Sequence, residues 1–290
     1  MGLAAVAGLL AATLFAPGSS TARDNASNAS LRIASFNLAY VTPTGGRRDW
    51  WLQRRDAAAA AISALDADVI ALQEVETFAE GPPSEINWQL DWIVRRFPAY
   101  AIAAVGPADL FPSTQPIAFR KDRFQLIGDG FEFHPGQGTA TTPRDATGDK
   151  RSYTTSAVLR DRFDGRILHV FNPHLSYLNV TLRRRGAAQV AERAGALIAR
   201  GETVIVAGDL NAIRLSEVGT SLREAGLAFG SVQSPTFHFG VGLGVFPAID
   251  HILHSPDLEV LGQPLLLNER RNGTWPSDHH PIAVDLAARR

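Results

Sequence analysis

The sequence predicts a mixed α/β fold in which helices cover stacked β-sheets. Segments with the alternation or short apolar run of a strand outnumber those with a helical apolar stripe. Hairpin-like pairs of strands occur together with strand–helix–strand units, which favours helices packed on sheets. From Leu31 onward no internal repeat, charge block or low-complexity linker divides the chain. A length of 290 residues suits one large domain or two small ones, with a substantial core.

The first half of this domain begins with a strand and a helix. Leu31–Phe36 alternates apolar and polar residues, as a half-buried strand does. Asp49–Leu65 has helical composition, with Trp51, Ala58, Ile62 and Leu65 along one stripe. The other segments expected here are a buried strand at Val69–Leu72, a helix at Ser84–Phe97 with Ser84 as its N-cap, and strands at Tyr100–Val105, Pro116–Arg120, Phe124–Ile127 and Thr155–Arg160.

The second half alternates strands with two further helices. A tight turn at Asp164-Gly165 leads into a strand at Ile167–Asn172. A long helix at Thr181–Arg200 ends at Gly201, and a shorter one at Ser216–Ala225 ends at Gly226. The remaining expected strands are Val204–Ala207, Ile249–Leu253, Glu259–Leu261 and Ile282–Leu286, and the expected surface loops are His134–Ser152 and Phe239–Val245.

Composition and charge exclude several classes of function. Hydrophobic residues make up 45% of the chain and charged residues 20%, which is typical of a soluble globular protein. The net charge of -1 provides no global basic field, so binding of a polyanion would need a local cluster of basic residues. The absence of cysteine excludes disulfides, thiol catalysis, cysteine-bound zinc and iron–sulfur clusters.

The amino terminus predicts export. Leu3–Ala16 is an apolar run of a length that suits the core of a signal peptide better than a membrane span. Small residues precede an expected cleavage after Ala22, so residues 1–22 form a signal peptide and 23–30 a polar leader to a catalytic domain at 31–290. No Lys or Arg precedes the run, and the alternative is an uncleaved segment that anchors the protein to a membrane.

Acidic, amide and imidazole residues collect at the ends of the expected strands. They are Asn37, Glu74, His174, Asp209, Asn211, Asp250, Asp278 and His279. Taken singly, each has an ordinary structural explanation as a turn residue, a helix or strand cap, or part of an ion pair. Their joint occurrence at strand tips indicates a site, because carboxylates there avoid the desolvation of the core and are still held rigidly.

The ordered motifs resemble those of the endonuclease/exonuclease/phosphatase family. The resemblance spans residues 31–287. It implies two mixed β-sheets packed face to face, with helices on the outside in a four-layer sandwich, and a divalent-metal site at one edge. It rests on Ser35-Phe36-Asn37, Gln73-Glu74, Asn172-Pro173-His174-Leu175, Gly208-Asp209-Leu210-Asn211, Ile249-Asp250-His251-Ile252 and Ser277-Asp278-His279-His280-Pro281.

Hydrolysis of a phosphate ester needs charge neutralisation, an in-line nucleophile and help for the leaving oxygen. Glu74 and Asp278 are hard oxygen donors suited to Mg²⁺ or Mn²⁺, and Asn37 can add an amide oxygen. Without cysteine, a hard ion is a better expectation than structural zinc.

The resemblance also implies roles for the catalytic residues. Asp209 would orient or deprotonate the attacking water, and Asn211 and His174 would donate to phosphate oxygens. Asp250 is the expected partner of His279, because a carboxylate behind an imidazole fixes its tautomer and direction. Whether Asp209 or His279 takes the proton stays open at this level.

The substrate is less determined than the chemistry. A nuclease, a phosphatase and a phosphodiesterase acting on a phospholipid headgroup all fit the motifs. Arg183–Arg185 could reach a polyanion, although a solvated helix end explains this run equally well. The alternative to an enzyme is a catalytically inactive module that binds phosphate or nucleic acid on the same fold. No obligate protein partner is evident, and the N-terminal run could associate with a membrane.

Overall fold

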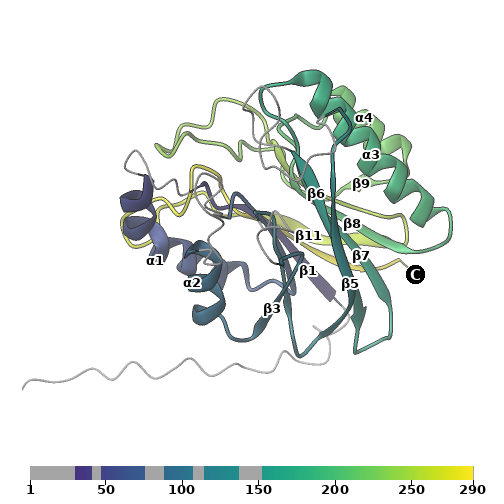
Figure 1. Ribbon diagram of the computed structural model, residues 1–290, viewed down its shortest axis with the longest axis horizontal. Helices are drawn as coiled ribbons and strands as arrows, with labels where there is room; N and C mark the ends of the chain where they lie inside the picture. The colour runs from purple at the N-terminus through teal and green to yellow at the C-terminus, as the bar shows by residue number, and fades with distance from the viewer. Residues whose placement is uncertain (1–29, 41–46, 76–87, 107–113, 137–151, 290) are drawn as a thin grey trace, which may run out of the picture.

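Two six-stranded mixed sheets form the centre of the protein (Figure 1). The structure, a computed structural model, describes residues 30–40, 47–75, 88–106, 114–136 and 152–289. The first sheet runs in the order β11 (Leu258–Leu266), β12 (Ile282–Ala288), β1 (Ser30–Asn37), β2 (Val69–Gln73), β4 (Ile117–Arg120) and β3 (Tyr100–Ala103). The second runs in the order β5 (Phe124–Phe133), β6 (Tyr153–Asp161), β7 (Ile167–His174), β8 (Thr203–Asp209), β10 (Asp250–His254) and β9 (Ala228–Phe229).

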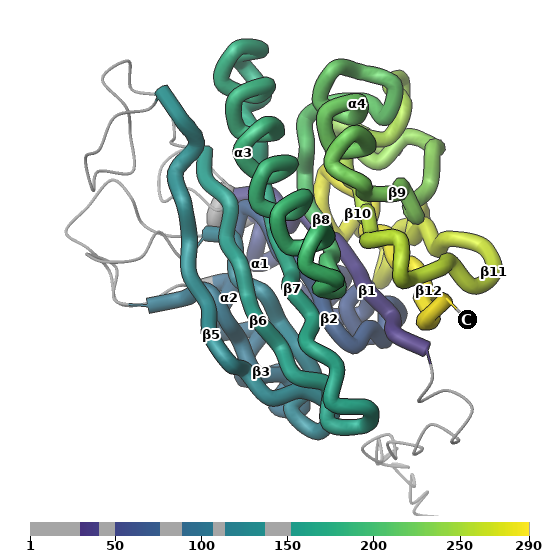
Figure 2. The backbone as a smooth tube through the Cα atoms, turned by 90° about the vertical axis from the view of Figure 1, so that its right-hand side faces the viewer, coloured from purple at the N-terminus to yellow at the C-terminus, as the bar shows by residue number. Residues whose placement is uncertain are grey.

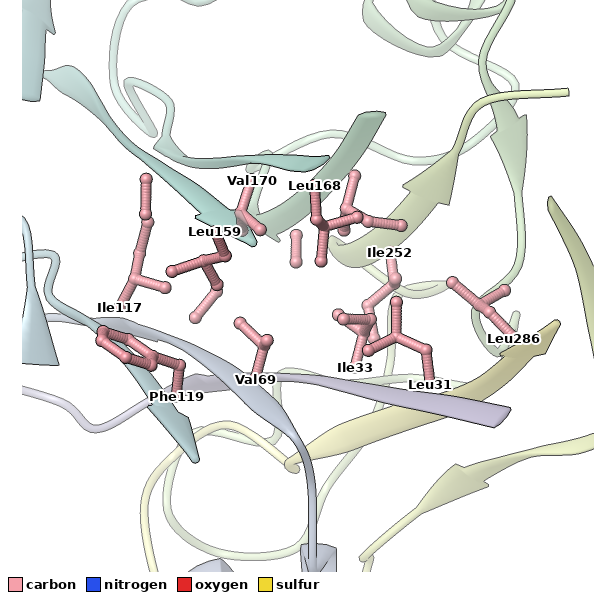
Figure 3. Close-up of a cluster of buried hydrophobic side chains, with 14 of the residues drawn as sticks. Leu31, Ile33, Val69, Ile117, Phe119, Leu159, Leu168, Val170, Ile252 and Leu286 are labelled. Carbon is pink, nitrogen blue, oxygen red and sulfur yellow. The ribbon is translucent and has the colours of Figure 1, made fainter. Parts of the chain in front are cut away.

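The sheets pack face to face through one apolar layer. Side chains alternate along each strand, so Ile33 and Val69 point inward while their neighbours Ala34 and Ile70 point outward. Figure 3 shows the inward set from both sheets meeting across this layer, with Val69 opposite Leu159. Burial of these aliphatic side chains is the main force that holds the two sheets together.

Helices cover the outer face of each sheet. α1 (Arg47–Leu65) and α2 (Trp88–Arg96) pack on the first sheet, and α3 (Val180–Ile198) and α4 (Glu217–Glu224) pack on the second. Figure 2 shows the two pairs on opposite sides of the strands. The four-layer arrangement expected from the sequence motifs is confirmed.

Local sequence signals set the ends of α3 and α4. The side chain of Asn179 accepts the backbone N–H of Leu182, and that of Ser216 accepts the N–H of Gly219. Gly201 and Gly226 follow the two helices with positive φ angles of 79° and 94°. The glycine stops were predicted from the sequence.

Most elements lie within two residues of their predicted bounds, and three strands differ most from the prediction. β5 continues to Phe133 although Gly128 and Gly130 follow the predicted strand, because β6 pairs with it along its whole length. β11 likewise continues to Leu266 beside β12. β9 was not predicted, since its two residues are held only by pairing with β10. The predicted N-cap Ser84 lies outside the described residues.

Strand pairing brings the motif-bearing ends to one edge of the sandwich. β1 and β2 are parallel with Asn37 beside Gln73, and β7 and β8 are parallel with His174 beside Asp209. β10 is antiparallel to β8 with Asp250 beside Asp209. Because parallel strands end at the same edge, residues far apart in sequence become neighbours there.

The part of the chain that the structure describes contains no helix long and apolar enough to cross a membrane. The apolar run Leu3–Ala16 lies outside it, so neither its cleavage nor an anchoring role is tested.

Candidate active site

Asn37 joins the two sheets at the centre of the site. Its Nδ2 donates to Glu74 Oε1 at 3.3 Å and to Asp209 Oδ2 at 3.1 Å. Its Oδ1, the atom expected to bind the metal, accepts the backbone N–H of Ala39 at 3.0 Å and retains one lone pair. The N–H of Tyr40 donates to Glu74 Oε2 at 3.0 Å. These contacts fix both carboxylates in place.

His174 lies across the same two carboxylates. Its Nε2 is 3.7 Å from Glu74 Oε1 and 3.6 Å from Asp209 Oδ2. It ends β7, whose pairing with β8 places it beside Asp209. The imidazole therefore faces the point on which Glu74 and Asp209 converge.

Asp250 and His279 form the expected carboxylate–imidazole pair. Nδ1 of His279 lies 2.8 Å from Asp250 Oδ2, and its Nε2 lies 3.9 Å from Asp209 Oδ2. A carboxylate opposite Nδ1 requires a proton on that nitrogen. The Phe237 ring packs on the imidazole with centroids 4.9 Å apart, and Thr236 Oγ1 accepts the backbone N–H of Asp250. The imidazole is thus held from several sides.

Asp278 reaches the site through a turn that separates it from the adjacent His279. Ser277 Oγ donates to the backbone oxygen of Asn37 at 2.7 Å, which ties this turn to the end of β1. The fully buried Arg54 of α1 donates to the backbone oxygens of Ala39 and Pro276. Arg54 therefore holds together the segments that follow β1 and precede β12.

Asn211 turns back onto the strand end that carries Asp209. Its N–H donates to Asp209 Oδ1 at 2.8 Å, and its Nδ2 donates to the Leu175 oxygen at 2.9 Å. One amide hydrogen of Asn211 remains for a ligand.

Burial and charge set the pKa values of the acidic groups. Burial raises the pKa of Glu74, whereas His174, His279 and the Tyr40 N–H lower it. Together these lowering effects exceed that of burial, so the pKa of Glu74 lies below the ordinary value. Burial and the neighbouring Asp250 raise the pKa of Asp209 to about 6, against the opposing effect of the two imidazoles. Two neighbouring carboxylates therefore differ in proton affinity.

The His279 imidazole is held in its charged form. Burial lowers its pKa, but Asp250, Asp209 and Asp278 together raise it to about 10. Burial alone would raise the pKa of Asp250, and its bond to His279 brings the pKa below the ordinary value. Burial, together with the negative charge of Glu74, raises the pKa of Asp278.

Backbone strain concentrates around these residues. Of the seven described non-glycine residues with positive φ angles, four lie here: Ala39, Glu74, Asn211 and Phe239, with φ between 46° and 57°. Asn tolerates this conformation, but Ala, Glu and Phe adopt it at a cost of about 1–3 kcal/mol each. Strain of this kind persists where the surrounding structure demands a particular side-chain direction, as in an active site.

The donors fit a hard divalent cation. Asp209 is buried and the Glu74 carboxylate is partly exposed, and among the described residues no Arg or Lys forms an ion pair with either. One ligand atom each from Asp209, Asp250 and His279 lies within 4.8 Å of the others, which is a metal-like grouping. In that group, however, His279 is a cation already bound to Asp250, and a protonated imidazole does not ligate a metal.

The structure brings together all eight residues proposed from the sequence, and it adds others. Gln73 Nε2 donates to Asn172 Oδ1 at 2.8 Å across the two sheets, directly beneath the site. Both residues stand in the quoted motifs, so the sequence contained a signal for them. Arg54 and Thr236 carried none, because nothing in the sequence places their segments beside the site.

The chain belongs to the endonuclease/exonuclease/phosphatase family, whose model matches residues 34–279. It is a family of metal-dependent phosphoesterases. None of the curated proteins compared with the sequence matches it.

Solved structures of low sequence identity share the fold. A family member from Bacteroides thetaiotaomicron has a TM-score of 0.74 at 22% identity, covering 90% of this chain and 98% of its own. A mannosyl-6-phosphatase from the same organism has a TM-score of 0.72 at 22% identity, covering 89% and 99%. TDP2 from D. rerio, complexed with a single-stranded DNA product, has a TM-score of 0.61 at 17% identity, covering 89% and 99%.

Proposed function

We propose that this protein hydrolyses phosphate esters with a bound divalent metal ion, Mg²⁺ or Mn²⁺. The observation that carries the proposal is the convergence on Asp209 of three polar groups from separate strands and loops. Asn37 Nδ2, His174 Nε2 and His279 Nε2 lie 3.1, 3.6 and 3.9 Å from Asp209 Oδ2. A buried acceptor surrounded by donors suits an anionic substrate and a water nucleophile.

Asp209 is the residue best suited to take the proton from water. Its pKa of about 6 lies near neutrality, where a base is both deprotonated and effective. His279, with a pKa raised to about 10 by Asp250, is charged and cannot accept this proton. The choice left open by the sequence is therefore resolved in this proposal in favour of Asp209.

The imidazoles and the amide stabilise the developing negative charge. His279 and His174 point Nε2 toward the position where a phosphate oxygen would lie, and Asn211 has one amide hydrogen to donate. Asp250 keeps His279 protonated and fixes its direction.

Glu74, Asp278 and the Oδ1 of Asn37 would hold the metal. Their oxygen donors match the preference of Mg²⁺, which retains several waters and needs few protein ligands. When bound, the ion neutralises phosphate charge and polarises the ester.

A substrate panel tests the proposal. Bis-p-nitrophenyl phosphate, p-nitrophenyl phosphate, a sugar 6-phosphate and plasmid DNA would each be incubated with Mg²⁺, Mn²⁺ or EDTA. We expect turnover of at least one ester that EDTA abolishes. No turnover of any ester, together with metal-independent phosphate binding, would instead support the alternative of an inactive binding module.

The panel also addresses the substrate class. The solved structures of similar fold include a sugar phosphatase and a protein bound to DNA, so the fold accommodates esters of very different size. A ratio of diester to monoester turnover above one would indicate a phosphodiesterase, and a ratio below one would indicate a phosphatase.

We also propose that the chain is exported, with cleavage after Ala22 as the expected processing event. N-terminal sequencing of protein expressed in its host would check this. A new terminus near Arg23 supports secretion, and an intact terminus in the membrane fraction supports the anchored alternative.

A further inference from the structure

Exposed large apolar side chains gather beside the candidate active site. Of the fifteen found on the described surface, ten lie on three segments, which we call the apolar rim. The segments follow β7, follow β8, and precede β10. The ten side chains are Tyr177, Leu178, Val180, Ile213, Leu215, Phe239, Val241, Leu243, Val245 and Phe246.

All three segments belong to the catalytic end of the sandwich. The first begins just after His174, and the second just after Asn211. The third follows Phe237, which is bridged to His279, and Gly240 in this segment approaches the Cβ of Asp278. In Figure 1 this third segment, in light green, projects outward above α1. The apolar rim therefore lies beside the catalytic residues on all three segments.

The third segment holds its apolar side chains outward through its own packing. Apolar residues alternate with Gly240, Gly242 and Gly244. A Cβ on Gly242 would lie 2.6 Å from the Trp275 ring, and one on Gly244 would lie 2.5 Å from Pro235. The backbone N–H of Gly242 also donates to His238 Nδ1. The glycines thus pack against the body of the protein and leave the larger side chains in solvent.

The charges around the rim are positive. The first two segments and their flanks contain four arginines, Arg183, Arg184, Arg185 and Arg214. Within residues 176–185 and 211–217 there is one acidic residue, Glu217, and it pairs with Arg184. Residues 239–246 carry no charge. Exposed apolar tips flanked by arginines match a surface that is apolar within and anionic at its edge.

We propose that the apolar rim docks onto an anionic phospholipid bilayer and presents the active site to that surface. Seven of the ten side chains are aliphatic, which suits acyl chains better than the stacked bases of a nucleic acid. This inference concerns binding and stands apart from the proposed hydrolysis. If both hold, esters in or near the bilayer are the substrates within reach.

Single labels at opposite ends of the molecule test the proposal in the full chain. The protein has no cysteine, so Val245→Cys and Phe163→Cys each accept one environment-sensitive fluorophore. Val245 is 53% exposed in the rim, and Phe163 is 55% exposed in the turn between β6 and β7 at the far end. The probe is a vesicle of phosphatidylcholine with about one third phosphatidylglycerol. Comparing the fluorescence of the two labels shows which end of the molecule contacts the bilayer, whether or not the N-terminal apolar run also binds it.

We expect the emission at position 245 to shift to the blue and to be quenched by brominated lipid, with position 163 unchanged. In the labelled protein, Phe246→Ser combined with Leu243→Ser should raise the lipid concentration needed for the half-maximal response at position 245 by about tenfold. The reason is that the double substitution removes two apolar side chains that would insert into the bilayer. Phe163→Ser should leave it unchanged. Equal responses at the two positions, or no response at position 245, would overturn the proposal. Turnover of bis-p-nitrophenyl phosphate reports the proposed hydrolysis separately.

Discussion

The two ends of the sandwich hold buried carboxylates in opposite ways. At the end where β1 begins, Arg123 donates to Asp68 at 2.8 Å and to Asp161 at 2.9 and 3.0 Å. All three side chains are buried, and they link the two sheets. At the catalytic end, Asp209 is as deeply buried and Glu74 is partly exposed, but their close partners are an amide and imidazoles.

The difference separates a structural use of buried charge from a functional one. An arginine between two acids neutralises one of their two negative charges and donates hydrogen bonds to both, so it occupies the position that a bound cation would take. Acids that are held by Asn37 and His174 keep charge that a mobile cation can balance. We therefore expect substitutions at one end to affect stability, and substitutions at the other to affect turnover.

The largest expected effect is on turnover at the catalytic end. Asp209→Ala should lower kcat by about a thousandfold, because it removes the proposed base. The melting temperature should stay equal or rise, since a buried carboxylate with a raised pKa is lost. Steady-state kinetics and thermal unfolding measure both effects. Retained turnover would show that Asp209 is not the base.

The next effect is on stability at the opposite end. Arg123→Met should reduce the free energy of unfolding by about 3–5 kcal/mol, because it removes the cation that pairs with two buried acids. Urea unfolding measures this change, and kcat below the melting temperature should be near that of the parent. The variant that also carries Asp68→Asn and Asp161→Asn should recover part of the loss. A kcat decrease comparable to that of Asp209→Ala would contradict the division between the two ends.

The stabilisation that Mg²⁺ gives the protein should depend on the catalytic end alone. Mg²⁺ at about one hundred times its dissociation constant should add about 2.7 kcal/mol to the free energy of unfolding. Glu74→Gln should remove most of this gain, whereas Asp68→Asn should preserve it. Thermal shift measurements with Mg²⁺ and with EDTA give the comparison. Equal metal-induced shifts in both variants would place the ion elsewhere.

A smaller effect concerns acid stability near the catalytic end. His134 is buried with Nε2 2.9 Å from Thr154 Oγ1, and burial lowers its pKa to about 3. Its ordinary value is about 6.5, so its contribution to stability is complete above that pH and declines as the pH falls toward 3.

His134→Phe should therefore lower the free energy of unfolding by about 1 kcal/mol at pH 7, because a hydrogen bond is lost. Between pH 7 and pH 5, the free energy of unfolding of the variant should fall by about 2 kcal/mol less than that of the parent, because the variant has no histidine at this position to protonate on unfolding. Urea unfolding across this range measures both numbers. The same pH dependence in parent and variant would show that other groups account for the acid sensitivity.

Much of the fold could be predicted because its signals are local. The alternation in β1, the apolar stripe of α1 and the glycine that follows α3 each depend on residues a few positions apart. The continuation of β5 past Gly128 could not be predicted in this way, since its hydrogen bonds come from β6. The burial of His134 likewise depends on α3, where the absence of a Cβ at Gly186 makes room for the ring.

By itself, the sequence determined which strands end in acids, amides and imidazoles, and in which order. Those residues specify a hard-metal and phosphate chemistry, because chemical type is a property of each side chain. Only the tertiary structure decided their partners. Asn37 meets Asp209 across 172 positions, and His279 meets Asp250 across 29. The pKa of Asp209 depends on those contacts and on burial, and distances in space arise only when the two sheets pack.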